Sequence, residues 1–390
     1  MLFSWFYGIT VKATLCQEFG LPSRCCPVYL CCAKERGRHA RGEGSGCSAV
    51  QLLSACPRAA GSAWTIGVVL DYSTFAVWVL LVALAAGLVL LYFGGNWLTD
   101  GAAALALKLR IEPVVIGLTV VSVCTSAPEL VTSFVSGAAG NSGLAVGNIL
   151  GSNLANLGLI LGIAALIHPF TVKERLIRAE VPILVGVTVV FYLFAIGGFN
   201  RIEGAFLLLM TGAYLVYVVK ASRRVRAPFV AEVEDELSGA RLSAVLAVVL
   251  LLGGTLALTV GAELLAGGGA ELAHRLGVSD FIIGISIVAV GTSLPELAAC
   301  IVAALKRQMD LVAGNLIGSN LFNMMLIGGS VPLFFPLAVD PAWLALEFPA
   351  MLVLTLVMWR FIWTGCHVHR WEAVILLALY IGIILASTLR

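Results

Sequence analysis

The sequence has little charge for its length. Only 12% of its 390 residues are Asp, Glu, Lys or Arg, and 60% are hydrophobic, whereas an average soluble domain carries about 25% charged residues. The mean hydropathy is +1.01. This composition excludes a soluble globular domain, and a net charge of +2 provides no basic surface for nucleic acid. We therefore predict an integral membrane protein whose surroundings are the lipid bilayer.

The membrane body also lacks the usual signs of an enzyme. It contains no nucleophile with a nearby base, no metal triad and no nucleotide-binding loop. Seven of the ten cysteines fall in the first sixty residues, which leaves Cys124, Cys300 and Cys366 in the apolar part. No Cys or His cluster indicates a soft metal, and no permanently bound cofactor is expected. We predict that the protein is not an enzyme.

Long apolar runs occupy the rest of the chain. A helix needs about 20 apolar residues to cross the hydrocarbon, and about ten such runs follow Phe75. We expect the first near Phe75 to Phe93, the fourth near Val181 to Ile196 and the fifth near Ala205 to Val219. These runs predict an all-α fold of ten transmembrane helices. The polar segment at 222–240 then links a first half, 71–221, to a second half, 241–390.

Residues 1–70 differ in kind from the remainder. They contain CC pairs, an Arg-rich stretch and no helical or strand period. The basic start of a signal peptide is missing, and the Cys and His spacings match no standard zinc pattern. We expect an extension of unknown structure, either disordered or the product of a mis-assigned start codon.

The distribution of Lys and Arg predicts the orientation in the membrane. About fourteen lie in the loops between spans 1–2, 3–4, 5–6, 7–8 and 9–10, against about three on the other side once the extension is excluded. This asymmetry places the loop at 220–241 in the cytoplasm and both termini of the membrane body outside. A bacterial inner membrane is the expected location. With five spans in each half, the second half is inverted relative to the first.

Two polar segments recur at a constant offset of 167 in the numbering. Segments 117–156 and 284–323 align without a gap, so that Glu129 matches Glu296. The same offset joins Gly94 to Gly261 and Gly101 to Gly268, so the duplicated unit is larger than the motif. The matched polar pairs are Thr125 with Thr292, Ser126 with Ser293, Asn148 with Asn315, Ser152 with Ser319, Asn153 with Asn320, and Asn156 with Asn323.

Each copy of the motif contains a Pro directly before its Glu. Pro prefers the first turn of a helix, so Pro128 and Pro295 predict that the helix breaks and restarts within the bilayer. Thr and Ser before the Pro can cap the new helix, and the break frees the carbonyls of Thr125 and Thr292 to face a cavity. Such backbone survives in a membrane only where protein or water surrounds it. We therefore predict discontinuous central helices in two inverted five-helix repeats.

The two glutamates predict a cation site. A charge at the centre of a membrane helix costs about 2.5 kcal/mol or more, and no Lys or Arg lies in either apolar core. The alternative is a pair of protonated Glu that only join helices. Asn156 and Asn323 follow their Glu at the same spacing, and Ser152 and Ser319 lie four residues before them on the same helical face. Six to eight oxygen ligands are typical of Ca²⁺.

Small residues near these side chains have a second interpretation. Gly147, Gly151, Gly314 and Gly318 recur at spacing four, which lets transmembrane helices pack closely. Both interpretations are compatible, because the glycines allow the approach while Asn and Ser supply oxygens. Cys124 occupies the place of Gly291 and is expected to be a small buried residue.

The paired TS-x-PEL and GN-x-x-GSN-x-x-N segments resemble the two alpha repeats of the sodium/calcium exchanger family. The resemblance covers Phe75 to Arg390 and is strongest to compact bacterial members without a large regulatory loop. It implies alternating access, with Ca²⁺ moved in exchange for Na⁺ or H⁺ through four central sites. It further implies that Ca²⁺ is held by Glu129, Glu296 and the Thr125 and Thr292 carbonyls. The remaining implied ligands are Ser126, Ser152, Asn156, Ser293, Ser319 and Asn323, with backbone oxygens of Ser122 and Ala289.

One departure from the family bears on the coupling ion. Some similar proteins have Asp where this chain has Asn323, and the neutral amide lowers the central negative charge. Several Na⁺ together displace one Ca²⁺, whereas protons do so by neutralising the two carboxylates. We expect a Ca²⁺ antiporter coupled to Na⁺, with H⁺ coupling as the alternative and a cation channel, in which the carboxylates form a selectivity constriction, as a further one.

Overall fold

We describe the protein from a computed structural model that covers residues 72–174, 176–223, 243–278, 291–365 and 367–389. Three predictions fall partly or wholly outside these ranges. They concern the extension at 1–70, nearly all of the linker at 222–240, and the start of the second polar segment at 284–290, which includes Ala289.

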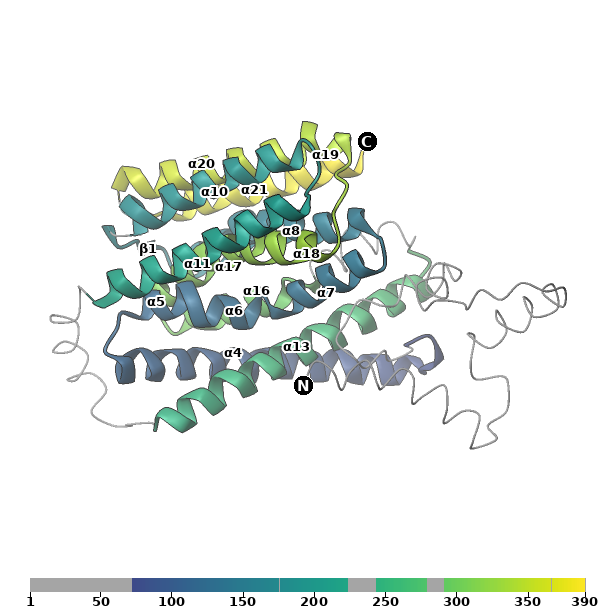
Figure 1. Cartoon of the computed structure of the whole chain (residues 1–390). Helices are drawn as coiled ribbons and strands as arrows, with labels where there is room; N and C mark the ends of the chain where they lie inside the picture. Colours follow the sequence, from purple (N-terminus) through teal and green to yellow (C-terminus); the bar gives the residue numbers. More distant parts are fainter. Residues whose placement is uncertain (1–71, 175, 224–242, 279–290, 366, 390) are drawn as a thin grey trace, which may run out of the picture. The chain divides into compact units, whose positions relative to one another are not determined.

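The first half contains five membrane-crossing segments (Figure 1). A short 3₁₀ turn, η1 (Tyr72–Thr74), precedes the first, and η2, η3 and η4 are π-helical turns. The elements are α4 (Val77–Leu109), α5 (Pro113–Ile116), η2 (Gly117–Val121), α6 (Ser122–Thr125), α7 (Ala127–Ala138), α8 (Ser142–Leu154), η3 (Ala155–Ile160), α9 (Leu161–Ile167), β1 (Phe170–Thr171), η4 (Leu176–Glu180), α10 (Val181–Ala195) and α11 (Arg201–Arg223).

The second half repeats the order of the spans, although its strand precedes the last span and the strand of the first half follows the third. Its elements are α13 (Ala244–Arg275), α16 (Leu294–Leu305), α17 (Met309–Phe322), the π-helical turn η6 (Asn323–Ile327), α18 (Gly328–Phe334), α19 (Pro341–Ala345), α20 (Glu347–Gly365), β2 (His367–Val368) and α21 (Arg370–Thr388). Across the described residues, eight helical segments are long and apolar enough to span a membrane, and the bent α5–α7 segment is a ninth. The short apolar helix α16 ends a further segment, whose beginning at 279–290 lies outside the description. The arrangement agrees with the predicted ten spans.

The first span is longer than predicted. We expected the first span near 75–93, but α4 continues for 33 residues, to Leu109. At 1.5 Å per residue it is about 50 Å long, more than the roughly 30 Å of hydrocarbon. The prediction was wrong because the GGN and TDG segments have the composition of a loop. In the structure, their polar side chains form hydrogen bonds or an ion pair, and their glycines pack against a neighbouring helix.

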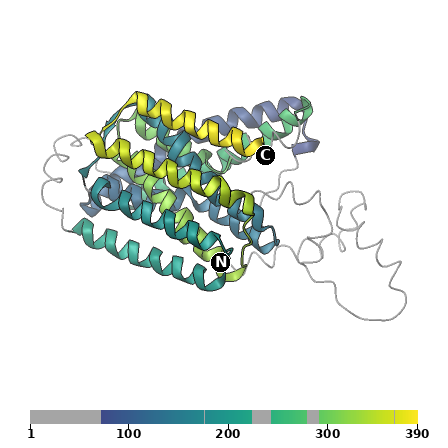
Figure 2. The same cartoon turned by 90° about the horizontal axis from the view of Figure 1, so that it is seen from above.

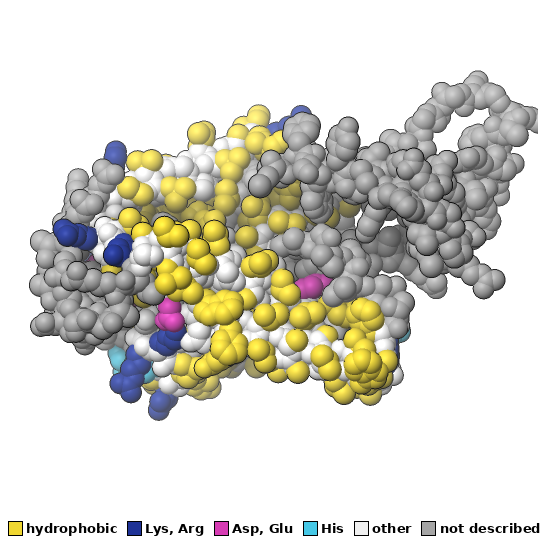
Figure 3. All heavy atoms as spheres, turned by 90° about the horizontal axis from the view of Figure 1, so that it is seen from below, with side chains coloured by type: hydrophobic (Ala, Val, Ile, Leu, Met, Phe, Trp, Pro, Cys, Tyr) yellow, Lys and Arg dark blue, Asp and Glu magenta, His cyan; other side chains and the backbone are white. Residues whose placement is uncertain are grey.

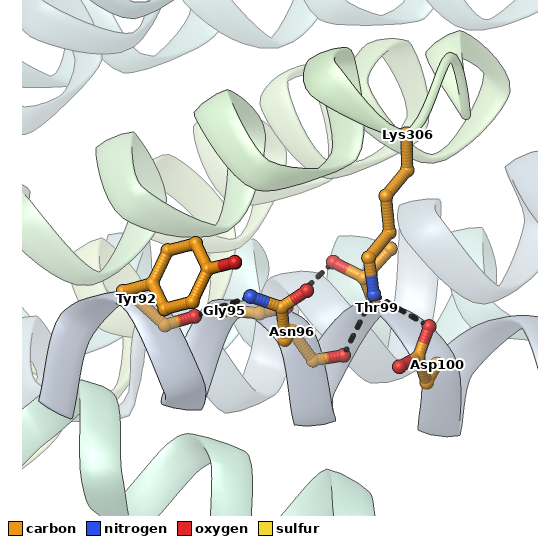
Figure 4. Close-up of polar contacts among 6 residues, drawn as sticks. All are labelled: Tyr92, Gly95, Asn96, Thr99, Asp100 and Lys306. Atoms are coloured by element: carbon orange, nitrogen blue, oxygen red, sulfur yellow. Dashed lines mark hydrogen bonds and ion pairs between the residues drawn. The ribbon is translucent and has the colours of Figure 1, made fainter. Parts of the chain in front are cut away.

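Figure 4 shows how the polar residues of this stretch are satisfied. The Lys306 ammonium at the end of α16 lies 2.6 Å from the Asp100 carboxylate and 3.5 Å from the carbonyl oxygen of Asn96. The Asn96 amide and the Thr99 hydroxyl each donate to the carbonyl four residues earlier in α4. Because this ion pair is partly exposed, it contributes at most about 1 kcal/mol, but it joins α4 to α16.

The glycines of α4 lie against the repeat-related helix α13. A Cβ added to Gly94 would lie 2.9 Å from the backbone nitrogen of Leu258, and one added to Gly101 would lie 2.8 Å from a carbonyl oxygen of α13. On α13, Gly254 and Gly261 approach the α4 backbone in the same way. Glycine at every seventh position of both helices therefore lets the two backbones touch where α4 and α13 cross (Figure 1).

The loops meet in two groups, one at each end of the spans. At one end, β1 pairs with β2, and Lys173 lies 3.3 Å from Glu112 and 2.8 Å from Asp310. These contacts join the loops after spans 1, 3, 7 and 9. At the other end, Phe199 pairs with Leu337 and joins the loops after spans 4 and 8. Four of the five loops predicted to be basic, those after spans 1, 3, 7 and 9, therefore lie at one end.

The helix surfaces between the two ends are apolar. Figure 2 shows the helices from above, with the C-terminal helices α20 and α21 side by side. On the face that Figure 3 shows, hydrophobic side chains cover the middle, and most of the visible Lys and Arg side chains gather at one end. This distribution suits a bilayer with a basic loop region on one side.

The turns at the ends of the spans preserve the repeat but exchange their residues. Arg110 (φ 53°) matches Gly277 (φ 84°) at the repeat offset, and Gly140 (φ 75°) matches Arg307 (φ 58°). All four have left-handed backbone, which favours Gly. The basic end has Arg at both of its positions and the opposite end has Gly. At the basic end, a positively charged Arg is therefore present although the left-handed backbone favours Gly.

We predict that Arg307→Gly raises the free energy of unfolding by roughly 0.5–1 kcal/mol. The change removes left-handed strain of about 1–2 kcal/mol, and the greater backbone entropy that Gly loses on folding offsets part of this gain. The reverse change at the matched turn, Gly140→Arg, should destabilise by a similar amount. Thermal unfolding of the purified protein in detergent measures both. Shifts of the same sign in the two variants would contradict the assignment of strain to the left-handed turns.

Candidate cation-binding site

Both polar motifs break a helix at the same residue. Ser126 (φ −83°, ψ 6°) and Ser293 (φ −92°, ψ 6°) leave the helical region, and the axis bends by 44° between Pro113–Thr125 and Ala127–Ala138. Beyond each break, the N–H of Leu130 or Leu297 donates to the carbonyl of the serine, at 3.1 and 3.0 Å. The predicted break and restart is confirmed, and Thr125 and Thr292 lie directly before it.

The predicted capping by side chains is wrong. Neither Ser126 nor Ser293 caps the helix that it precedes. The Ser126 hydroxyl instead donates to Oε1 of Glu296, at 3.1 Å, across the boundary between the two halves. A hydrogen bond donated to a carboxylate is stronger than one donated to a neutral acceptor, so this contact helps to join the two halves at the site.

The two carboxylates are buried at the starts of α7 and α16. Glu129 and Glu296 are each 1% exposed, and Ser126, three residues before Glu129, contacts the Glu296 carboxylate. Each lies in the first turn of its helix, where the helix dipole favours negative charge. Both oxygens of Glu129, and Oε2 of Glu296, have no hydrogen-bond partner in the described part of the chain. The centre therefore holds strong acceptors without donors.

The neighbouring helices add further unpaired oxygens. Ser152 and Asn156 on the α8–η3 segment, and Asn323 at the start of η6, are at most 2% exposed. The Ser152 and Ser293 hydroxyls and both polar atoms of Asn156 and Asn323 have no hydrogen-bond partner among the described residues. A buried amide or hydroxyl left unpaired costs about 1–3 kcal/mol. A bound cation would relieve that cost at several positions together.

The remaining predicted ligands already have hydrogen bonds. Thr125 Oγ1 lies 3.2 Å from Oδ1 of Asn315 and 3.5 Å from Oγ of Ser319. The Ser122 hydroxyl donates to the Gly117 carbonyl at 2.7 Å and to the Asn315 carbonyl at 3.0 Å. The structure thus joins Ser122 and Thr125 of the first half to Ser319 of the second through Asn315. Thr292 is half-buried, and Ala289 lies outside the described residues.

Two features of the site were not predicted. The α8 and α17 helices each change to π-helical winding at equivalent places, Ala155–Ile160 and Asn323–Ile327. A π-turn rotates the side chains that follow it and frequently marks a functional site. The second feature is the role of Asn148 and Asn315 in hydrogen bonding. The common repeat offset identified both residues as a pair but gave no partner for either.

Close helix packing is confirmed at two of the four predicted glycines. A Cβ on Gly314 would lie 2.5 Å from the Val114 carbonyl oxygen, and one on Gly318 would lie 2.7 Å from the Leu118 carbonyl oxygen. No described atom lies within 4 Å of the same position on Gly151. These contacts place α17 directly on η2 and bring Ser319 to the helix break. Cys124, expected to be buried, is half-buried.

The donor set is made of oxygen. Carboxylates, carboxamides and hydroxyls are ligands for hard cations such as Ca²⁺ and for alkali ions. No cluster of three His, Cys, Asp or Glu occurs among the described residues. The arrangement can hold positive charge between two carboxylates and can supply neutral oxygens for ions of lower charge.

We predict unequal effects for two matched substitutions measured without divalent cations. Ser126→Ala removes the hydroxyl that donates to Glu296, so the melting midpoint in detergent should fall, reflecting a loss of roughly 1.5–3 kcal/mol. Ser293→Ala removes a hydroxyl without a hydrogen-bond partner among the described residues and should leave the midpoint nearly unchanged. Equal losses in both variants would show that this hydrogen-bond asymmetry is absent in solution.

Comparisons with known proteins agree with this geometry. A family model described as "Sodium/calcium exchanger protein" matches residues 79–220 and 246–389. The putative antiporter CaxA of Alkalimonas amylolytica is 37% identical over 302 residues, covering 76% of this chain and 94% of the relative. The sodium/calcium exchanger MaX1 of Methanosarcina acetivorans is 31% identical, covering 77% and 95%. The solved sodium/calcium exchanger of Methanococcus jannaschii superposes with a TM-score of 0.69 at 31% identity, covering 80% and 99%.

Proposed function

Because the chain belongs to the sodium/calcium exchanger family, we propose that it is a secondary-active antiporter that moves Ca²⁺ across the membrane in exchange for Na⁺. Membership makes it a multi-pass membrane transporter and not an enzyme. The finer assignment of the exchanged ions depends on the site.

The observation that carries the proposal is the pair of buried carboxylates, one from each inverted half and linked through Ser126, among oxygens without donors in the described part of the chain. Two carboxylates neutralise one Ca²⁺. Several Na⁺ supply the same charge and use the hydroxyl and amide oxygens as well. The two kinds of ion then compete for one set of ligands.

Competition at a buried site also explains why transport would be an exchange. A site without cations leaves two like charges in the low-dielectric interior, and an uncompensated buried charge is strongly unfavourable. Reorientation between the two membrane faces is therefore favoured only when cations fill the site. Ca²⁺ leaving on one side must be replaced by Na⁺ before the protein returns. Alternating access with this constraint gives antiport.

We assign the ligands as follows. Glu129 and Glu296 bind Ca²⁺ with the carbonyl oxygens of Thr125 and Thr292. The Ser122 carbonyl accepts the Ser126 N–H at 2.9 Å and lies 3.4 Å from the Thr125 hydroxyl, so a cation there would compete with that weaker contact. The monovalent ions use the side-chain oxygens of Ser126, Ser152, Asn156, Ser293, Ser319 and Asn323, and the backbone oxygens of Ser122 and Ala289.

The relatives support Na⁺ as the coupling ion. MaX1 is named a sodium/calcium exchanger, and solved structures of the exchanger NCX_Mj come from soaks with Na⁺ and Sr²⁺ or Ca²⁺. An H⁺/Ca²⁺ antiporter is the second candidate, favoured by one observation. Asn323 is fully buried and neutral, so the central charge consists of two carboxylates that two protons would neutralise.

We further propose the orientation in the membrane. The end with the basic loops, including the linker at 222–240, faces the cytoplasm, and both termini of the membrane body lie outside. The halves at 71–221 and 241–390 are the two inverted units, each containing one alpha repeat, at 117–156 and 284–323. The relative YrbG of Escherichia coli is named an inner membrane protein, which supports location in a bacterial inner membrane.

The test is uptake of ⁴⁵Ca²⁺ into proteoliposomes loaded with Na⁺, compared with liposomes that have only a pH gradient. We predict uptake that requires internal Na⁺ and falls to background in Glu296→Gln. The matched control, Glu174→Gln, removes an exposed carboxylate that pairs with Arg178 and should transport normally.

Other outcomes lead to different conclusions. Uptake driven only by the pH gradient would replace Na⁺ by H⁺ as the coupling ion. Uptake that depends on neither trans ion would indicate a channel, and normal uptake by Glu296→Gln would contradict the carboxylate site.

A further inference from the structure

The buried carboxamide of Asn315 connects three helices at the centre of the protein. Its Oδ1 accepts hydrogen bonds from Thr125, at 3.2 Å, and from Ser319, at 3.4 Å. Its Nδ2 donates to the thiol sulfur of Cys300, at 3.5 Å. Each of these four residues is at most 1% exposed. One side chain therefore orients two hydroxyls and is itself anchored by a thiol.

The other half of the protein shares one bond of this connection but not all of it, because Ser152, which matches Ser319, has no hydrogen-bond partner among the described residues. At the repeat offset, Asn148 corresponds to Asn315 and Ser133 corresponds to Cys300, and Nδ2 of Asn148 donates to Ser133 Oγ at 2.9 Å. That amide also donates to the carbonyl of Glu129, at 3.1 Å. Among the described residues, the side-chain NH₂ group of Asn315 has one hydrogen-bond acceptor, Cys300, whereas that of Asn148 has two acceptors. The orientation of Asn315 thus depends more heavily on its single partner.

The orientation of this carboxamide decides where two hydroxyl protons point. A hydroxyl has one hydrogen, and while Thr125 and Ser319 donate it to Oδ1 of Asn315, their lone pairs remain available in other directions. If the carboxamide were flipped so that its oxygen and nitrogen exchanged places, its NH₂ group would face both hydroxyls, and they would have to accept. Their hydrogens would then point away from Asn315, an arrangement that repels a cation.

We propose that Cys300 and Asn315 are positioning residues for cation binding. Cys300 accepts from the Asn315 amide, which fixes Oδ1 toward Thr125 and Ser319 and keeps their oxygen lone pairs available to ions. Neither residue needs to touch a cation, and the effect matches that of outer partners that orient metal ligands. This inference rests on the proposed function, which assigns the Ser319 hydroxyl and the Thr125 carbonyl to the cation site, and it adds the Thr125 hydroxyl as a further oxygen there.

The surroundings of Cys300 permit a clean test. A cavity of about 10 Å³ adjoins it, lined also by Thr99 and Asn315, so a slightly larger side chain can be accommodated. Cys300→Val and Cys300→Thr have nearly the same shape, but Thr retains an oxygen acceptor. Cys300→Ala and Cys300→Ser form a second pair with smaller side chains. A defect of folding would affect both members of a pair, whereas loss of the acceptor affects only Val and Ala.

The experiment measures ⁴⁵Ca²⁺ uptake as a function of external Ca²⁺ in Na⁺-loaded proteoliposomes. In Cys300→Val, we expect the Ca²⁺ concentration for half-maximal uptake to rise about five-fold, the effect of losing one ordinary hydrogen bond, with a nearly unchanged maximal rate. Cys300→Thr and Cys300→Ser should remain near wild type. Ser133→Ala should shift the value by less than about two-fold, since Asn148 keeps its second acceptor.

Three results would overturn the proposal: no shift in Cys300→Val and Cys300→Ala, equal shifts in the Val and Thr variants, or a shift in Ser133→Ala as large as in Cys300→Val. Absence of Na⁺-driven uptake by the wild-type protein would instead refute the proposed function. Failure of the inference and failure of the function are thus distinguishable. Cooperative melting transitions of all four variants without cations should show that each of them is folded.

Discussion

The structure depends on keeping two like-charged carboxylates buried inside a membrane protein. Glu129 and Glu296 are almost fully buried, and the ion pairs of the described residues lie near helix ends and in loops, away from both. Several local features stabilise these buried carboxylates. Each helix restarts just before its Glu, so that a helix N-terminus faces the charge, and the Ser126 hydroxyl donates to Glu296 instead of capping its own helix. Close packing at Gly314 and Gly318 brings α17 to the break.

Duplication supplies these features twice, but the two copies are not equivalent. The inverted repeat places the same turn at both ends of the spans, with Arg at the basic end and Gly at the other. Near the centre, Asn148 holds a carbonyl and a serine, whereas Asn315 orients two hydroxyls and relies on a thiol. A site built from two inverted copies would be symmetric if the sequences were identical. The presence of Cys300 where the first half has Ser, and the bond from Ser126 to Glu296, introduce the asymmetry.

Much of the fold could be predicted because its strongest signals are local or repeated. Apolar runs identified the spans, the constant repeat offset identified the duplicated site, and proline before each Glu identified the helix breaks. The length of α4 could not be predicted, since its Gly, Asn and Asp letters are typical of loops and only contact with α13 and Lys306 makes them helical. The π-turns and hydrogen-bond partners also depend on tertiary packing. Side-chain capping failed as a prediction because Ser126 and Ser293 both have ψ near 6°, whereas a capping residue usually has extended backbone.

The central claim is that both halves build one shared cation site. Equilibrium binding of ⁴⁵Ca²⁺ to the purified protein in detergent tests it most directly, with Glu129→Gln and Glu296→Gln measured separately. We predict one Ca²⁺ per chain for the wild-type protein and loss of high-affinity binding in either variant, since each removes half of the neutralising charge. Two Ca²⁺ per chain, with one retained in each single variant, would show two independent sites and contradict the account.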